Sequence, residues 1–174
     1  MLRGFFKVPE AYNEPIKDYA PGSPERESLL NIIEDFRSYE RDIPMIIGGK
    51  EVRTENKFSI HPPHEHKHTL GHYYMGDAAH VNMAIDAALE ARPAWQSLPW
   101  EHRASIFLKA ADLIAGPYRD KINASTMLGQ SKNVFQAEID AACEMADFFR
   151  FNVQYMTQIY KDQPISSKGI WNRV

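Results

Sequence analysis

Histidine side chains crowd one short segment of this chain, and their spacing suits metal binding. Five of the seven histidines fall within residues 61–72, and three of them alternate at His64, His66 and His68. In an extended backbone such alternating side chains share one face, where they could hold Zn²⁺ or Ni²⁺. No cysteine accompanies them, however, Glu65 would point the other way, and the preceding Pro-Pro pair is typical of an exposed connection. We therefore expect no metal site here, and at most weak binding to a nickel column.

The single cysteine is the other side chain with obvious reactivity, since a thiolate can act as a covalent nucleophile. Cys143 lies in the middle of a predicted helix beside alanines, without a neighbouring histidine or a helix N-terminus to lower its pKa. We interpret it as a small buried packing residue, so no catalytic residue is predicted. One cysteine cannot form an internal disulfide, which favours a reducing compartment.

Two glycine-containing segments are candidates for a phosphate-binding loop. Gly48 and Gly49 lack the Walker spacing and a following helix. The GQSK segment at 129–132 is expected to end one helix and begin the next, where backbone amides bind an anion only weakly. The sequence therefore predicts no cofactor-binding residue in this chain.

One long amphipathic helix should position most of the candidate groups, because apolar and acidic side chains between residues 129 and 156 recur at helical spacing. The apolar set is Val134, Ala137, Ala141, Met145, Phe148, Phe149 and Met156, and the acidic set is Glu138, Asp140, Glu144 and Asp147. Pro164 marks the outer limit of this helix, and residues 165–174 could begin a strand.

The beginning of the chain should be less regular. Three prolines and little periodicity make residues 1–22 an extended arm that wraps an existing surface. Ser23 can then cap a helix that has Pro24 in its first turn and stops before Pro44. The buried stripe of that helix is expected to comprise Leu29, Leu30, Ile32, Ile33 and Phe36.

A β-hairpin is predicted at residues 45–52, with its turn at Gly48 and Gly49 and a continuation at residues 58–60. The hairpin and its continuation form the only sheet that the sequence predicts before the C-terminal residues. A mainly helical chain is therefore expected.

Three helices should separate this hairpin from the long helix. Asp77 caps the first, and Pro93 should kink or end it. Trp95 and Trp100 anchor the connection to the second helix, which ends at Gly116, and a third, shorter helix follows. The buried stripe of the first of these helices is expected to comprise Val81, Ala84, Ile85, Ala88 and Leu89.

Five sequence words occur in a particular order along nearly the whole chain. They are NEP at 13–15, GSPER at 22–26, IPMIIGGKEV at 43–52, RASIFLKAADLI at 103–114 and QAEIDAACEMADFFRFN at 136–152. Together they closely resemble the amino-terminal part of the aldehyde dehydrogenase superfamily, specifically its 1-pyrroline-5-carboxylate dehydrogenase branch. The histidine-rich segment at residues 61–74 departs from the family pattern.

The resemblance implies NAD-dependent oxidation of L-glutamate γ-semialdehyde to glutamate in proline catabolism, through a thiohemiacetal on a cysteine. In that family the reactive cysteine, the general-base glutamate and the cofactor segment lie beyond the position of Val174. The resemblance therefore implies an amino-terminal fragment, with NAD as cofactor of the parent enzyme and none bound tightly by this chain.

The resemblance also implies two substrate-binding residues, Glu144 and Phe149. At the position of Glu144, a family carboxylate points toward the substrate end of the catalytic tunnel, where it could pair with the substrate ammonium or position water. Phe149, about one turn away, could line the apolar part of the channel. From the residues alone, Glu144 would simply be solvated, and at least one of Phe148 and Phe149 would be core.

Composition restricts the partners. The net charge of −3, from 20 basic and 23 acidic residues, gives no electrostatic footprint for nucleic acid or an anionic membrane. No run approaches the ~18 apolar residues of a membrane span, and the first residues hold too short an apolar patch for a secretory signal. The expected location is the cytoplasm, or the mitochondrial matrix if the source is eukaryotic.

We therefore predict a mainly α chain with a β-hairpin, the amino-terminal portion of an aldehyde-dehydrogenase-like α/β fold with its dinucleotide-binding sheet largely absent. Residues 1–22 form the arm, and residues 23–174 form the truncated helical part. The chain is predicted to be a catalytically silent fragment of a semialdehyde dehydrogenase. The full-length enzyme is expected to act on a small molecule, and a homo-oligomer is expected. The alternatives are a self-associating module that uses an uncovered apolar helix face, and a histidine metal module.

Overall fold

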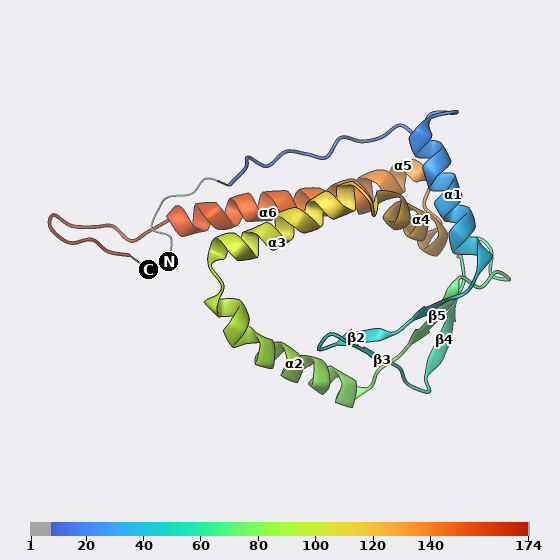
Figure 1. Cartoon of the computed structure of the whole chain (residues 1–174), viewed down its shortest axis with the longest axis horizontal. Helices are drawn as coiled ribbons and strands as arrows, with labels where there is room; N and C mark the ends of the chain where they lie inside the picture. Colours follow the sequence, from blue (N-terminus) through green and yellow to red (C-terminus); the bar gives the residue numbers. More distant parts are fainter. Residues whose placement is uncertain (1–7, 174) are drawn as a thin grey trace.

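The computed structural model describes residues 8–173 and shows an open arrangement of helices with two small sheets at one end (Figure 1). Residues 1–7 of the predicted arm and Val174 of the predicted terminal strand lie outside the described residues. In chain order the elements are α1 (Pro24–Ser38), β1 (Arg41–Ile43), β2 (Met45–Ile47), β3 (Lys50–Val52), β4 (Lys57–Ile60), β5 (Gly71–Tyr74), α2 (Ala78–Ser97), α3 (Trp100–Ala115), α4 (Arg119–Gln130), α5 (Val134–Ala137), the π-helical segment η1 (Glu138–Cys143) and α6 (Glu144–Lys161). The prediction of a mainly helical chain is confirmed.

Helix α1 begins where its capping signal predicts. The side chain of Ser23 accepts a hydrogen bond from the backbone N–H of Arg26, and Pro24 occupies the first turn, where the missing N–H has no helical partner to lose. Leu29 is buried, whereas Leu30 is exposed, so the predicted stripe was wrong at this position. Neighbouring residues of an α-helix point about 100° apart, and Leu30 falls outside the stripe that Leu29, Ile32, Ile33 and Phe36 form against the core.

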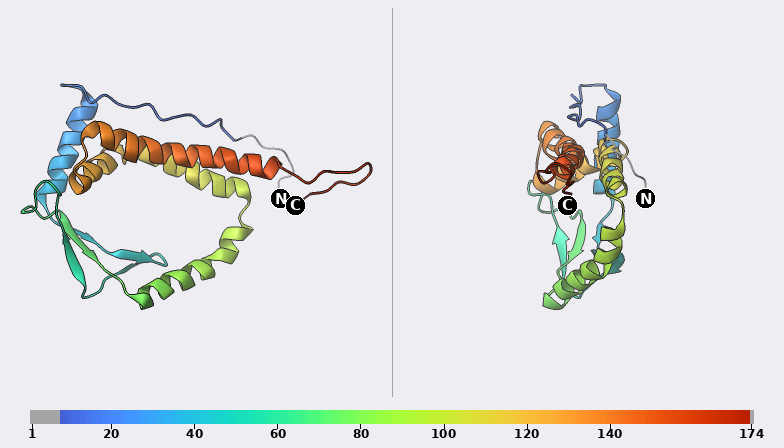
Figure 2. Two further views of the ribbon diagram at one scale, coloured as in Figure 1. Left: turned by 180° about the vertical axis from the view of Figure 1, so that it is seen from behind. Right: turned by 90° about the vertical axis from the view of Figure 1, so that its left-hand side faces the viewer.

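The core of the described chain is divided between two helix pairs. Tyr19 of the arm, Leu29 of α1 and Ala124 of α4 form one buried cluster. Helices α3 and α6 lie side by side and antiparallel, as Figure 2 shows from both directions, with the small residues Ala104 and Ala146 buried in this layer. Small side chains allow the backbones of two long helices to approach closely.

The predicted hairpin is confirmed as strands β2 and β3. They pair antiparallel, with Met45 opposite Val52. Gly48 and Gly49 both have positive φ, 57° and 76°, as the two central residues of a type I′ hairpin turn require.

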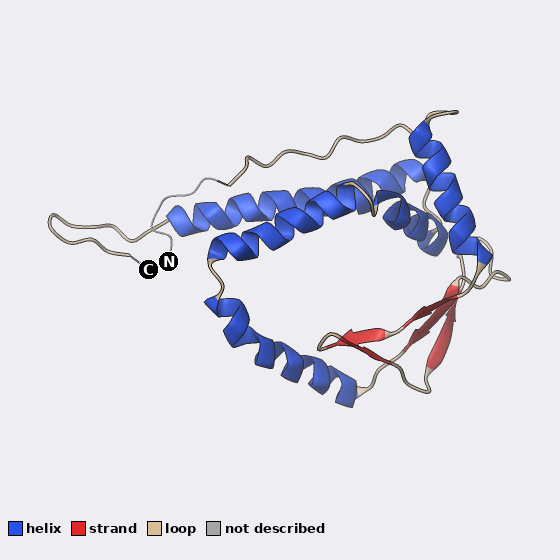
Figure 3. Ribbon diagram, viewed as in Figure 1, coloured by secondary structure: helices blue, strands red, loops and turns tan. Residues whose placement is uncertain are grey.

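A second sheet was not predicted from the sequence. Its strand order is β1-β5-β4, with β5 parallel to β1 and antiparallel to β4. The parallel pair sets Gly71 opposite Arg41 at very close range, since a Cβ built on Gly71 would lie 2.3 Å from the Arg41 carbonyl oxygen. The prediction of a single sheet was therefore wrong, and residues 58–60 belong to the second sheet. Figure 3 shows both sheets together at one end of the molecule.

Helix α2 starts at the predicted cap but does not follow the rest of its prediction. Asp77 accepts hydrogen bonds from the backbone N–H groups of Ala79 and His80, and the His80 ring completes a capping box. The helix continues through Pro93 to Ser97, so Pro93 does not end it.

The predicted buried stripe of α2 was also wrong, because no residue of this helix is buried. Val81, Ile85 and Leu89 are all at least half exposed. In the described part of the chain α2 contacts strand β2 and the following turn, and its Trp95 meets α3, but these contacts leave most of its apolar side chains exposed. An apolar face of this kind is usually covered by another helix or by a sheet, and no element within residues 8–173 covers it.

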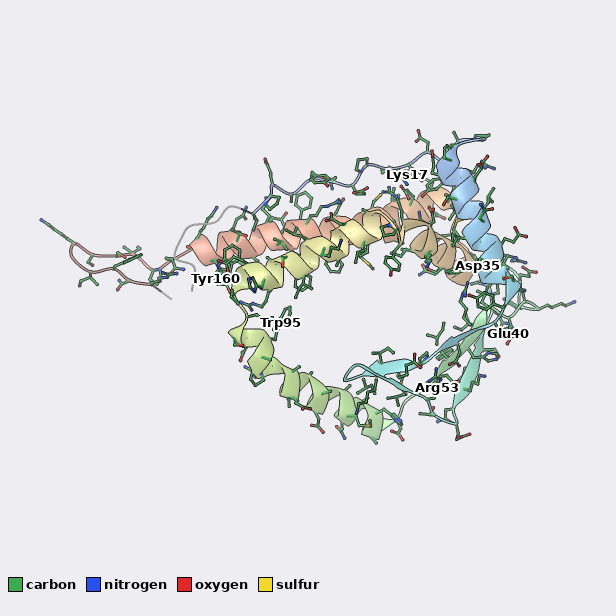
Figure 4. All side chains as sticks on the ribbon, viewed as in Figure 1. Lys17, Asp35, Glu40, Arg53, Trp95 and Tyr160 are labelled. Atoms are coloured by element: carbon green, nitrogen blue, oxygen red, sulfur yellow. The ribbon has the colours of Figure 1, made fainter. Side chains whose placement is uncertain are left out.

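The two tryptophans do anchor the junction between α2 and α3. Trp95 meets the ring of Phe107 edge-on at 6.4 Å, and Trp100 stacks on Tyr160 of α6 at 5.7 Å between centroids. Figure 4 labels Trp95 and Tyr160 on either side of this junction.

The predicted long helix runs without a break in the helical backbone from Val134 to Lys161. Its hydrogen-bond pattern changes from α to π within η1 and returns to α in α6. Asn133 caps its beginning through a capping box with Gln136. The helix ends before Pro164, and residues 162–173 contain a turn and no strand, so the predicted terminal strand was wrong for the residues that are described. None of the helices within residues 8–173 is long and apolar enough to cross a membrane.

Candidate functional site

A fully buried carboxylate, Glu138, lies at the first position of η1. It accepts hydrogen bonds from the Tyr19 hydroxyl at 2.8 Å, the Asn123 side-chain amide at 2.7 Å and the backbone N–H of Lys17 at 2.8 Å. The guanidinium of Arg119 also binds it, through Nε at 3.1 Å and through a second nitrogen. These partners come from the arm and from α4, so one side chain ties three segments together.

The ion pair extends into a chain of four alternating charges. Arg119, itself 2% exposed, donates from Nη1 to Glu14 of the arm at 2.6 Å and from Nη2 to the Pro15 carbonyl at 2.7 Å. The other carboxylate oxygen of Glu14 binds Arg150 of α6 at 2.8 Å. Charges with so little access to water are tolerated only when they are paired and hydrogen-bonded, as these are. We call Glu14, Arg119, Glu138 and Arg150 the charge chain.

The electrostatics of the charge chain hold both members of the buried pair ionised. Burial alone would raise the pKa of Glu138, but the hydrogen bonds from Arg119, Lys17, Asn123 and Tyr19 outweigh it and the pKa is lowered. Burial would likewise lower the pKa of Arg119, and its bonds to carboxylates raise it instead. The pair therefore stays charged over the physiological range.

Cys143 lies against this pair and is unsuited to nucleophilic attack. It is 5% exposed, and its sulfur is 3.4 Å from a nitrogen of Arg119 and 3.8 Å from a carboxylate oxygen of Glu138. Burial, followed by the charge of Glu138, raises the pKa of the thiol to about 11. The interpretation of Cys143 as a buried packing residue is confirmed.

Helix α6 has two distinct faces. Ala146, Arg150, Val153 and Thr157 are buried toward α3 and the arm. Successive residues turn by about 100° around an α-helix, so Glu144, Phe148, Tyr155 and Ile159 lie on the opposite side. Glu144 is exposed, and the three apolar side chains are exposed by 49% to 73%. We call these four residues, with Met145 beside them, the outer face of α6.

The two predicted substrate residues are thus placed differently. Glu144 stands on the outer face, at the point where η1 passes into α6. Phe149 is half-buried and packs on Phe107 of α3, with ring centroids 5.7 Å apart. Phe148, 58% exposed, is the phenylalanine that shares a face with Glu144. Both assignments remain predictions.

The histidine-rich segment is not extended, so its alternate imidazoles do not line one face. Residues 62–68 form two successive turns, in which the Glu65 N–H binds the Pro62 carbonyl and the His68 N–H binds the Glu65 carbonyl. His64 instead bonds to the Ser131 hydroxyl at 2.7 Å. Among residues 8–173, no group of three or more histidine, cysteine, aspartate or glutamate side chains is arranged to hold a metal ion.

Neither glycine-containing segment has the geometry of a dinucleotide-binding turn. Gly48 and Gly49 lead into strand β3 and not into a helix, and the GQSK segment closes α4 with Ser131 in the left-handed conformation. Neither segment forms the glycine-rich turn into a helix N-terminus that cradles a pyrophosphate.

Comparison with known proteins identifies the class of this chain. A family model described as the aldehyde dehydrogenase family matches residues 51–174, well over half of the sequence. The chain belongs to the aldehyde dehydrogenase family. Within it, delta-1-pyrroline-5-carboxylate dehydrogenases match 97% of the chain at 45% to 49% identity, so the chain falls in the 1-pyrroline-5-carboxylate dehydrogenase branch. The predicted family is confirmed.

The individual relatives show how much of such an enzyme is present. The delta-1-pyrroline-5-carboxylate dehydrogenase of Agaricus bisporus is 49% identical over 170 residues, which cover 97% of this chain and 31% of the relative. The human protein, whose name places it in mitochondria, is 45% identical over 154 residues, covering 88% and 27%. The chain therefore spans about a third of the length of these relatives.

Solved structures agree. The Mycobacterium tuberculosis enzyme, described as bound with NAD, matches with a TM-score of 0.96 at 46% identity, over 99% of this chain and 32% of that one. The predicted fold class, the amino-terminal portion of this dehydrogenase fold, is confirmed. The division into an arm at residues 1–22 and a helical part at residues 23–174 remains a prediction.

The charge chain was missed by sequence reasoning. Glu138 was grouped with the polar side chains of an amphipathic helix, yet it is 0% exposed. Arg119 and Asn123 lie four residues apart, about one turn of α4, but their convergence with Tyr19 on Glu138 depends on three segments folding together.

Proposed function

We propose that this chain supplies the amino-terminal part of an NAD-dependent dehydrogenase that oxidises L-glutamate γ-semialdehyde, formed from 1-pyrroline-5-carboxylate, to glutamate in proline catabolism. Its specific contribution is one wall of the substrate site, carried by the outer face of α6. Alone, the chain is catalytically silent, and NAD is bound by the part of the enzyme that corresponds to the remaining two thirds of its relatives.

The observation that carries the proposal is the exposed position of Glu144 among apolar neighbours in a chain 49% identical to such an enzyme. The semialdehyde bears an ammonium and a carboxylate beside the aldehyde. A carboxylate at the edge of an apolar surface can pair with that ammonium once a second wall excludes water. Phe148 shares the outer face with Glu144 and can limit the space available to the carbon chain, whereas Phe149, packed on Phe107, is the weaker candidate for that role.

The test is a graft. This chain replaces the matching amino-terminal segment of the Agaricus bisporus enzyme, and NADH formation from the semialdehyde is followed by absorbance. The graft is expected to be active, and the chain alone inactive. Glu144→Gln in the graft is expected to raise KM by about ten- to a hundredfold, because a charged hydrogen bond contributes roughly 1.5–3 kcal/mol.

The matched control is Glu27→Gln, which neutralises an exposed glutamate on α1. It should leave both kcat and KM unchanged. If the graft folds and oxidises the semialdehyde with the same KM whether residue 144 is Glu or Gln, the assignment of Glu144 fails. NADH production by the purified chain alone would refute its catalytic silence.

A second candidate is a self-associating module, and the uncovered apolar side chains of α2 favour it. Val81, Ile85 and Leu89 present an apolar surface to solvent, and such surfaces commonly mark protein interfaces. Sedimentation of the chain at several concentrations tests this. A species that remains monomeric throughout would remove self-association, and with it the expectation of a homo-oligomer for this chain.

The names of the relatives also support a proposal for the cellular location of the parent enzyme. Several eukaryotic relatives are named mitochondrial. We assign the parent enzyme to the mitochondrial matrix in a eukaryotic source and to the cytoplasm otherwise, which fractionation with a tagged gene product would test.

A further inference from the structure

The π-helical segment η1 changes which side of α6 faces outward. An i→i+5 segment holds one residue more than an α-helical turn, and such insertions occur mostly as single turns inside α-helices, frequently at functional sites. Because each residue of an α-helix turns by about 100°, one additional residue rotates everything that follows by about that angle.

The charge chain requires this rotation. Arg150 follows Glu138 by twelve residues. In an uninterrupted α-helix these two positions would lie about 120° apart, and the extra residue of η1 reduces the separation to about 20°. Both side chains can then face the arm, where Glu14 bridges Arg119 to Arg150 and Arg119 binds Glu138. The contact of Arg119 with both Glu138 and Cys143, five residues apart, has the same origin.

The rotation decides what α6 presents to the outside. With the extra residue, Glu144, Phe148, Tyr155 and Ile159 point away from the arm. In an uninterrupted helix with Glu138 held in place, Asp147, Phe151 and Gln154 would point away from the arm. Met145, Phe149 and Met156 would then turn inward. At present Asp147 and Gln154 instead accept hydrogen bonds from backbone N–H groups of the arm.

We propose that the charge chain is a register lock, so that Glu138, Arg119, Glu14 and Arg150 are positioning residues for Glu144. They hold η1 in its π-helical form and thereby present Glu144 and the apolar outer face to the second wall of the substrate site. The role of Glu144 in this inference rests on the proposed function. The register itself does not, and it can be measured on the chain alone.

The experiment compares two neighbouring thiols in the Cys143→Ala background. Tyr155→Cys places a thiol on the outer face, and Gln154→Cys places one against the arm. With Glu138 intact, the thiol at 155 is expected to react severalfold faster with a maleimide. After Glu138→Ala the helix regains regular α-turns and the order of the two rates inverts. Asp140→Asn, a change on the same segment at an exposed site, should leave the order as it was.

A deletion gives an independent answer if Glu138→Ala fails to fold. Removing Ala141 takes out the extra residue while keeping Glu138 and Arg150, which then lie about 20° apart in a regular helix. This variant should fold, with the thiol at 155 still the faster. An unchanged order in folded Glu138→Ala, or an unfolded or inverted Ala141 deletion, would overturn the register lock, because a merely stabilising network predicts lower stability without inversion.

The two proposals can fail separately. Labelling needs no substrate, so an unaltered KM for Glu144→Gln would remove the substrate role and leave the register lock intact. Conversely, a labelling order that ignores Glu138 would leave the graft experiment unaffected.

Discussion

Neutralising the buried carboxylate of Glu138 should destabilise the chain far more than neutralising its exposed neighbour on the same segment. In Glu138→Gln, the Arg119 guanidinium at 2% exposure loses its principal counter-charge, and an amide group is turned toward donors that need an acceptor. Removing one partner of a buried ion pair costs about 3–5 kcal/mol. Asp140→Asn breaks only a half-exposed pair with Lys132 at 2.9 Å, which should cost about 0–1 kcal/mol.

The assay is urea unfolding followed by circular dichroism. With a slope of about 2 kcal/mol per molar urea, the midpoint of Glu138→Gln should fall by about 1.5–2.5 M, and that of Asp140→Asn by less than about 0.5 M. The slopes should stay equal, which shows that stability and not compactness has changed. If the two midpoints differ by no more than the error of their measurement, the burial and pairing of Glu138 contribute nothing to the free energy of unfolding, and the reasoning is refuted.

Three further outcomes follow from the contacts of Glu138 and Cys143 and from the cap of α2. Because the pKa of Glu138 is lowered in the folded chain, its stabilising contribution is present above the ordinary pKa of 4.5 and is lost as pH falls below that value through the lowered pKa. Acidification should therefore lower the free energy of unfolding less in Glu138→Gln than in the unchanged chain. Parallel curves of stability against pH would contradict this. The thiol of Cys143, with its pKa of about 11, should react with a disulfide reagent near neutral pH only after denaturant is added, and immediate reaction in the native chain would disprove its burial. Asp77→Ala should cost about 1 kcal/mol and lower amide-exchange protection in α2 more than in α6, whereas equal losses would show that the cap acts on the whole chain.

Local chemistry predicted the ends of most helices. Ser23 and Asp77 cap helices through their own side chains, and Gly116 ends α3 as expected. Such signals depend on neighbours within a few residues, so a single sequence contains them in full. The hairpin at Gly48 and Gly49 was predictable for the same reason.

Contacts between distant residues were not predictable. The parallel pairing of β1 with β5 joins strands of three and four residues that are too short to show a period, and three other strands lie between them in the sequence. The exposed side chains of α2 show the converse: helical spacing of apolar residues predicted a buried stripe, and within residues 8–173 no residue of this helix is buried.

The candidate site divides along the same line. Glu144 could be singled out only through the family resemblance, since an acidic residue on an amphipathic helix is usually solvated. The predicted apolar positions Met145 and Phe148 are exposed, and they follow η1, a departure from the regular α-helix that no analysis of α-helical periodicity detects. The charge chain that accompanies η1 spans the arm, α4 and α6 and becomes visible only when they are assembled.

The close approach of two backbones at Gly71 restricts what the gene can encode there. A methyl group at this position would lie 2.3 Å from the Arg41 carbonyl oxygen, and that oxygen belongs to a paired strand that cannot move aside. Gly22, by contrast, has a positive φ but open space around it, so asparagine can replace it at modest cost. In a saturation library, codon 71 should therefore be the more strongly depleted of the two, with alanine as poorly tolerated as larger residues.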